Sequence, residues 1–207
     1  VRVTSLALLF LCTEPALISS GPAVARAQSD IELAIDIAAE VGAGVVLVPF
    51  FGKNKIETDA ELNTAIESLQ PLVEVAEAKG VTIGVENALN HAQNQAMMDG
   101  LSSPRVLTYY DVGNVMARKL DPADGIRQLG TQAIAMLHFK DVKLTEGAPP
   151  DFNVPLGGGN VQFRSVVQAL KAVGYDGWLI METPPGDDAV ASAKANLEYV
   201  RAILAQG

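Results

Sequence analysis

Several features that mark other classes of protein are scarce in this 207-residue chain. There is a single cysteine, Cys12, which excludes a disulfide within the chain and favours a reducing, cytoplasmic location. No stretch approaches the ~20 apolar residues of a membrane span. The 15 Lys and Arg are scattered and stand against 24 Asp and Glu, a net charge of −9 that argues against a nucleic-acid partner. The remaining composition, 49% apolar and 19% charged, is typical of a globular protein.

The first 27 residues imitate a secretory signal without matching one. An apolar run at 6–12 is followed by Ala25-Arg26-Ala27, which resembles a cleavage site. However, Glu14 and Pro15 interrupt this stretch, and the distance to the cleavage-like motif is long. Val1–Phe10 fits a buried strand equally well, and we favour that interpretation. Because the chain lacks an initiator Met, we expect it to begin within a longer protein.

Segments with the pattern of strands alternate with segments with the pattern of helices along the whole chain. Thr58-Asp59-Ala60-Glu61 is a capping box at the start of one helix, and a weaker helix is expected from Ala88 to about Leu101. The expected strands lie at about 3–9, 44–50, 81–86, 105–111, 133–139 and 177–182. Six repeats of strand and helix predict the α/β class, with a parallel sheet covered by helices. Because no change of composition divides the chain, we expect one domain over residues 1–207.

Two α/β architectures fit this alternation. Six units fall short of the eight in a (β/α)8 TIM barrel, so either the sheet is open and doubly wound or two N-terminal units lie outside this sequence. No dinucleotide fingerprint or phosphate loop follows a strand, because Gly157-Gly158-Gly159 comes after a loop. The barrel is therefore the better prediction, N-terminally truncated and with about six of its eight strand–helix units present.

Four of the expected strands end in a residue that can bind a metal ion. They are Glu86, Asp111, His138 and Glu182, each about one strand–helix unit from the next, with a loop at 147–159 lengthening the last interval. The carboxyl ends of barrel strands converge, so these side chains can reach one point. Three carboxylates and an imidazole suit Mn²⁺, Mg²⁺ or Co²⁺, with Zn²⁺ as an alternative. The sequence therefore predicts one divalent metal site.

The motifs around these four residues resemble those of a known family. They are Val-Glu-Asn at 85–87, Tyr-Tyr-Asp-Val-Gly-Asn at 109–114, His-Phe-Lys-Asp at 138–141, Leu-Gly-Gly-Gly-Asn-Val-Gln-Phe at 156–163 and Gly-Tyr-Asp-Gly-Trp-Leu-Ile-Met-Glu at 174–182. Together they are similar to the sugar phosphate isomerase/epimerase family of xylose isomerase-like TIM barrels. That family includes ketose 3-epimerases, L-ribulose-5-phosphate 3-epimerases, hydroxypyruvate isomerases and inosose dehydratases. Aligned by motif, Val1–Phe10 would be the third of eight strands.

The resemblance implies one divalent metal ion held by Glu86, Asp111, His138 and Glu182. Glu86 and Glu182 would also be the catalytic acid and base. One would remove the proton beside a ketose carbonyl and the other would return it from the opposite face, through an enediolate that the metal stabilises. We expect a metal-dependent isomerase or epimerase of the EC 5 class, acting on a small ketose or sugar phosphate. An inosose-type dehydratase on the same scaffold and a non-catalytic sugar-binding remnant are the alternatives.

Three further residues are predicted to contact substrate, namely Asn87, Asn114 and Lys140. Lys140 and Asp141 fit a solvated ion pair at a strand end equally well, and the pair Gly113-Asn114 is expected to turn the chain. We expect His91 to be a surface residue on a helix, not a ligand. The predicted partner is a small-molecule sugar or sugar phosphate, with neither nucleic acid nor membrane, and the chain could form a homo-oligomer.

Overall fold

Six strands follow one another as neighbours in the order β1-β2-β3-β4-β5-β6. The structure is a computed structural model that describes residues 2–14 and 16–206, so the parts of the predictions that rest on Val1 and Pro15 lie outside the described residues. The strands are β1 (Ser5–Ala7), β2 (Val45–Pro49), β3 (Thr82–Glu86), β4 (Val106–Asp111), β5 (Ile134–Phe139) and β6 (Leu179–Met181). The four pairings described, β1 with β2, β2 with β3, β3 with β4 and β5 with β6, are all parallel. Helices follow the strands in alternation, so six strand–helix units of the (β/α)8 TIM-barrel type are present, as predicted.

The chain divides into two compact units, Val1–Tyr109 (unit 1) and Tyr110–Gly207 (unit 2), and β4 runs from one into the other. The expectation of one domain over residues 1–207 stays a prediction. Among the described residues, no helix combines the length and the apolar character needed to cross a membrane.

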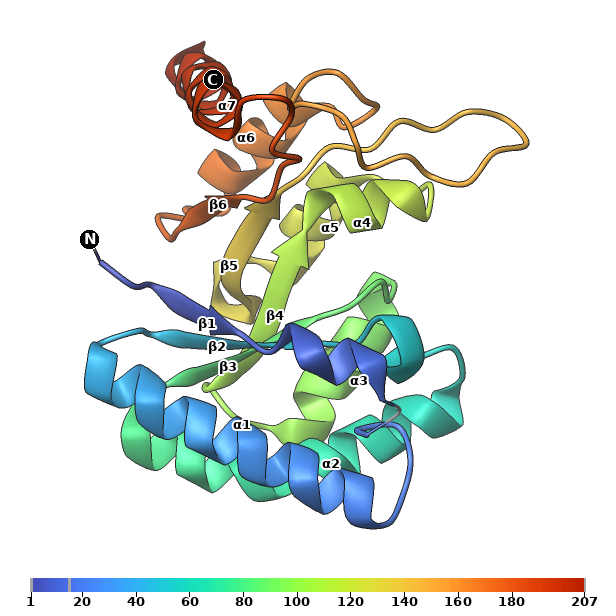
Figure 1. Ribbon diagram of the computed structural model, residues 1–207, viewed down its shortest axis with the longest axis vertical. Coiled ribbons are helices and arrows are strands. Elements are labelled where there is room, and N and C mark those ends of the chain that lie inside the picture. Colours follow the sequence, from blue (N-terminus) through green and yellow to red (C-terminus); the bar gives the residue numbers. More distant parts are fainter. Residues whose placement is uncertain (1, 15, 207) are drawn as a thin grey trace. The chain divides into compact units, whose positions relative to one another are not determined.

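Unit 1 contains β1, β2, β3, the first part of β4 and three α-helices: α1 (Pro22–Val41), α2 (Asp59–Lys79) and α3 (His91–Leu101). Figure 1 shows α1 and α2 side by side along the strands of this unit. Ile35 of α1, Leu69 of α2 and Ile83 of β3 are fully buried in one hydrophobic core. Helix α2 begins at the predicted capping box, in which Thr58 Oγ1 accepts the N–H of Glu61 and the Glu61 carboxylate accepts the N–H of Thr58.

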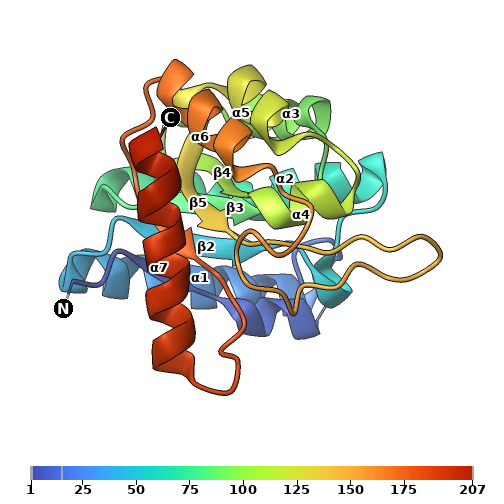
Figure 2. The same ribbon diagram turned by 90° about the horizontal axis from the view of Figure 1, so that it is seen from above.

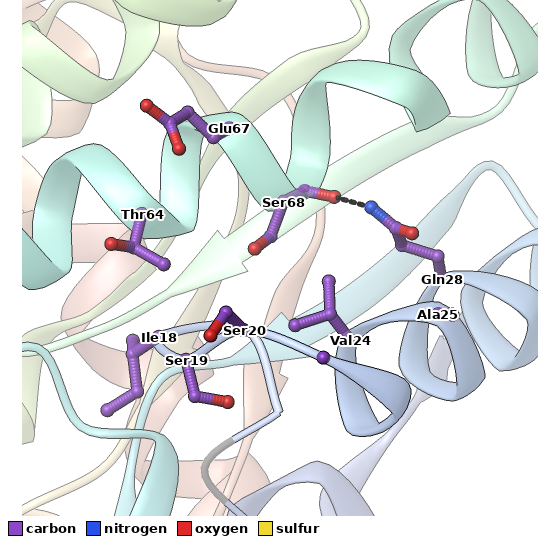
Figure 3. A pocket seen from close by; sticks show the side chains of 10 residues that line it. Ile18, Ser19, Ser20, Val24, Ala25, Gln28, Thr64, Glu67 and Ser68 are labelled. Carbon is purple, nitrogen blue, oxygen red and sulfur yellow. Dashed lines mark hydrogen bonds between the residues drawn. The ribbon is translucent and has the colours of Figure 1, made fainter.

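A hollow of about 570 Å³ opens in unit 1 between the loop before α1 and the middle of α2. Ser20 and Val24 line it on one side, and Thr64 and Ser68 line it on the other (Figure 3). Gln28 Nε2 donates a hydrogen bond to the Ser68 carbonyl at 2.8 Å, which ties the two helices together beside the hollow. None of the residues predicted for the site lines it.

Unit 2 contains the end of β4, β5, β6 and four α-helices: α4 (Val112–Ala117), α5 (Pro122–Leu129), α6 (Phe163–Ala172) and α7 (Ala189–Gln206). The ring of Phe163 packs against Phe139 with centroids 5.3 Å apart and against Tyr199 at 5.8 Å, which joins β5, α6 and α7 in one core. The segment 140–162, between β5 and α6, forms the long loop coloured orange in Figure 2. Lys143 and Asp151 pair across it as an isolated antiparallel bridge.

Three local expectations were wrong in detail. Strand β1 covers only Ser5–Ala7, because the chain then enters a 3-10 helix at Leu9–Thr13. The weak helix expected from Ala88 begins at His91, because Asn90 caps it by accepting the N–H of Gln93. Gly113 and Asn114 do not form a simple turn: they lie in α4, because the side chain of the preceding Asp111 caps that short helix.

Candidate metal centre

Three of the four predicted ligands come together in unit 2, each from the carboxyl end of a different strand. Asp111 is the last residue of β4, His138 is the penultimate residue of β5, and Glu182 directly follows β6. Each offers a ligand atom, and these atoms lie within 4.8 Å of one another. His138 Nδ1 is 3.2 Å from Glu182 Oε2 and 3.7 Å from Asp111 Oδ2. The convergence expected of parallel strand ends is therefore present among these three residues.

The two carboxylate oxygens of Asp111 have different tasks. Oδ1 accepts the backbone N–H groups of Gly113 at 2.8 Å and Asn114 at 2.9 Å, which fixes the start of α4. Oδ2 accepts the side-chain amide of Asn114 at 2.9 Å and faces His138. Because Asp111 is almost completely buried, the hydrogen bonds to Oδ1 hold the other oxygen in a fixed position. Asn114, predicted to contact substrate, is placed here as the support of a carboxylate.

Lys140 adds a cationic side chain to this group. Its Nζ is 2.9 Å from Glu182 Oε2 and 3.7 Å from Asp111 Oδ2, the same two oxygens that face His138. The ring of Phe152, from the long loop, lies over the ammonium with its centroid 5.0 Å from Nζ. We call Asp111, His138, Lys140 and Glu182 the charged cluster. It pairs two carboxylates with one fixed cation and one imidazole.

Glu182 is held ionised by these neighbours. Burial by itself would raise the pKa of its carboxyl group, but the hydrogen bond from His138 and the charge and hydrogen bond of Lys140 outweigh it and lower the pKa to about 2. The carboxylate is therefore available as a ligand or as a base throughout the neutral range. It is also a weak base, so any carbon acid that it deprotonates must first be made more acidic.

Asp141, which follows Lys140 in the sequence, has a different role that sequence reasoning missed. The solvated ion pair of Lys140 and Asp141, left open as an alternative from the sequence, does not describe Asp141, which is buried. The Asp141 carboxylate is buried and accepts four backbone N–H groups of its own loop, from Val142, Gly157, Gly159 and Val161, at 2.8 to 3.1 Å. We call this arrangement the loop clamp.

Two glycines make the loop clamp sterically feasible. Gly157 has φ of +83°, which other residues rarely adopt, and a Cβ at Gly159 would collide with the Asp141 carboxylate. A signal for the clamp was present in the sequence. Side chains alternate along an extended segment, so His138 and Lys140 share one side while Phe139 and Asp141 point to the other.

The remaining predicted site residues lie in unit 1. Glu86 is the last residue of β3 and is 4% exposed. The next residue, Asn87, is also buried, and its amide is used within the unit: Nδ2 donates to Asn94 Oδ1, and Oδ1 accepts the N–H of Leu89. His91 is half-buried rather than on the surface, and its Nδ1 has no hydrogen-bond partner among the residues described. The catalytic, metal-binding and substrate-binding roles assigned to these residues stay predictions.

The donor set of unit 2 fits a hard divalent cation. Two carboxylates and one imidazole whose ligand atoms lie within 4.8 Å of one another are ligands that Mn²⁺, Mg²⁺, Co²⁺ and Zn²⁺ accept. Asp111 also shows the supporting hydrogen bonds that usually orient a metal ligand. The cluster is therefore a candidate metal centre.

Comparison with known proteins shows similarity along almost the whole chain. The family model described as xylose isomerase-like TIM barrel matches residues 2–203. The chain is 28% identical over 187 residues to a 2-epi-5-epi-valiolone 7-phosphate 2-epimerase of Actinoplanes sp., with 89% of this chain and 66% of that protein covered. It is 29% identical over 218 residues to an L-ribulose-5-phosphate 3-epimerase of Shigella flexneri, with 100% and 74% covered. The chain spans between 50% and 74% of the length of five curated relatives that it matches.

A solved structure shows the same fold. The chain superposes on an L-ribulose 3-epimerase with a TM-score of 0.79 and 22% sequence identity, over 93% of this chain and 72% of that one. At this identity the likeness concerns the fold alone.

Proposed function

Because the chain belongs to the family of xylose isomerase-like TIM barrels, we propose that it is a metal-dependent isomerase or epimerase acting on a small ketose or sugar phosphate. One observation carries this proposal, namely the convergence of Asp111, His138 and Glu182 at the strand ends of unit 2. Two relatives that cover most of the chain, the 2-epi-5-epi-valiolone 7-phosphate 2-epimerase and the L-ribulose-5-phosphate 3-epimerase, support it.

Asp111, His138 and Glu182 would hold the metal ion, with Mn²⁺, Mg²⁺ or Co²⁺ favoured by the oxygen-rich donor set and Zn²⁺ as an alternative. We propose Glu86 as the fourth ligand. Like Asp111, it is a buried carboxylate that ends a parallel strand. A buried carboxylate is normally paired or bound to a metal, because an isolated charge away from water is very unfavourable.

When bound, the metal ion polarises the ketose carbonyl and balances the negative charge that develops on its oxygen, which makes the neighbouring C–H bond acidic enough to react. Glu182 is ionised and would take that proton. Glu86, as the partner acid, would return a proton to the same carbon from the other face, which inverts the carbon. Lys140 holds the Glu182 carboxylate at 2.9 Å and so fixes the direction in which it accepts the proton.

The proposal is tested by replacing each glutamate by glutamine in the intact protein. Glu86→Gln and Glu182→Gln keep the side-chain size and one oxygen but remove the base, so turnover should fall by about 10²–10⁴, the usual contribution of a general base. Proton NMR in heavy water, with saturating Mg²⁺ in place of Mn²⁺, measures both epimer formation and the entry of deuterium at the carbon beside the carbonyl. Loss of water from the substrate would identify a dehydratase instead.

The matched control is Glu146→Gln, which changes an exposed glutamate of the long loop and should leave turnover at the parent rate. If Glu86→Gln and Glu182→Gln both epimerise as fast as the parent, neither carboxylate is the base, and the proposed proton transfer is wrong even if the metal site is real.

A further inference from the structure

A second hollow, of about 360 Å³, lies within unit 2. Residues of three segments line it, among them Asn153 and Pro155 of the long loop, Pro184 and Gly186 of the segment after β6, and Ser192 and Asn196 of α7. The two prolines give rigid apolar walls, and the two amides and the hydroxyl give polar groups. Such a mixture is typical of a site that orients a small ligand.

The side chain of Asn196 is the strongest sign that a ligand belongs there. Only 3% of this residue is exposed, and its Oδ1 accepts the N–H of Leu156 at 3.0 Å. Because an N–H can donate only to the oxygen, this bond settles which end of the amide is the NH₂ group. Nδ2 has no acceptor among the described residues. Because Asn196 lines the hollow, a ligand hydroxyl there can accept a hydrogen bond from Nδ2 in place of water.

Two chain segments connect the hollow with the charged cluster. Asn153 directly follows Phe152, whose ring lies 5.0 Å from Lys140 Nζ. On the other side, Pro184 is two residues beyond Glu182, which contacts the same Nζ. A molecule whose reacting end lies at Glu182 can extend along these segments towards Asn196.

The electrostatics of the hollow favour a neutral ligand over an anion. The six residues named above carry no charge. The amide groups at the start of α7, which could otherwise attract a phosphate, are already used by Asp188, whose carboxylate accepts the N–H groups of Val190 at 2.9 Å and Ala191 at 3.0 Å. A phosphate at this helix end would meet a carboxylate.

We propose that this hollow binds the neutral, hydroxylated end of the substrate, with Asn196 Nδ2 as a hydrogen-bond donor. The chain would then act on a free sugar in preference to the same sugar carrying a phosphate at that end. The identity of the bound molecule as substrate rests on the proposed function. The binding of a neutral polyol in the hollow does not, and the two are tested separately.

Binding is tested with ribitol, a five-carbon polyol without a carbonyl group, so that no reaction can occur. The side-chain amide signal of Asn196 is followed by ¹H–¹⁵N NMR and is identified by its absence in Asn196→Asp, a variant that keeps the acceptor for Leu156. The signal should shift saturably with ribitol and should not shift with inorganic phosphate at equal ionic strength. No shift with ribitol, or an equal shift with phosphate, would overturn the proposal.

Specificity is tested with L-ribulose and L-ribulose 5-phosphate, which differ only in the phosphate. The parent should show at least a tenfold higher kcat/KM for the free sugar. Asn196→Asp should raise KM for L-ribulose about tenfold with kcat within twofold, whereas Asn63→Asp, an exposed change on α2, should alter neither. Preference for the phosphate would refute the inference and leave the catalytic proposal intact. If neither sugar reacts, the proposed function fails, and the ribitol titration alone decides the role of the hollow.

Discussion

Asp111 and Asp141 are two buried aspartates at the ends of neighbouring strands of unit 2, and their surroundings differ in kind. Asp141 uses both carboxylate oxygens on backbone N–H groups of its own loop. Asp111 uses one oxygen in that way and turns the other towards the side chains of His138 and Lys140. Asp111 is 2% exposed and Asp141 is 1% exposed, so burial does not distinguish them.

The partners of a buried carboxylate indicate what it is for. Backbone amides cannot leave, so the Asp141 carboxylate is committed to holding the loop. Side chains can change rotamer, so the oxygens of Asp111 and Glu182 that face His138 and Lys140 can turn to a metal ion. The loop clamp is therefore a structural element, and the charged cluster is the part of unit 2 that can bind and react. The clamp also positions Phe152 and Asn153, so it supports the cluster from outside.

The largest effect is expected from breaking the loop clamp. Asp141→Asn replaces an accepting oxygen by an NH₂ group that faces backbone donors, so the free energy of unfolding should fall by roughly 3–5 kcal/mol. Urea unfolding measures this change. The control Asp151→Asn alters an exposed aspartate of the same loop that accepts one N–H, from Asn153, and should lower stability by less than about 1 kcal/mol. Equal effects of the two variants would contradict the distinction drawn here.

An intermediate effect is expected from the imidazole of the charged cluster. His138→Ala should weaken Mn²⁺ binding, measured by calorimetry, by about 100-fold or more, since even supporting residues around a metal site are typically worth 10–100-fold. His91→Ala removes the other histidine of the chain, which lies at the start of α3 in unit 1, and should bind Mn²⁺ like the parent. The assignment of the ligands is wrong if the two variants bind Mn²⁺ equally well.

The smallest effect is expected from the pH dependence of stability. The pKa of Glu182 is lowered from 4.5 to about 2 in the folded protein, so its ionised form stabilises the fold above pH 4.5, and this stabilisation is lost as the pH falls towards 2. In metal-free protein, the parent should lose stability relative to Glu182→Gln across that window. Because the side chain is about half exposed, the difference should stay below about 1 kcal/mol. Parallel stability curves for the two proteins between pH 4.5 and 2 would show that the cluster does not hold Glu182 ionised.

Much of the fold followed from local sequence patterns. The six strands lie within about two residues of the predicted ranges, because short apolar runs between helical stripes fix both the type and the position of an element. The capping box at Thr58 and the glycine ends of α1 and α2 are local signals of the same kind. Helix α4 was missed because its cap is supplied by a residue that was interpreted only as a ligand, Asp111.

The chain itself determined that strand ends would carry Glu86, Asp111, His138 and Glu182, because parallel strands in a barrel present their last residues on one side whatever the loops do. Only the tertiary structure decided how the neighbouring residues are used. Lys140 reaches Glu182, 42 positions away, and Asp141 reaches amides up to 20 positions away. The oxygen of Asn196 accepts the N–H of Leu156, 40 positions away, which leaves the NH₂ group for other partners. Folding brings these distant polar groups together away from water, where each must form a hydrogen bond. Local sequence patterns do not show which groups will meet.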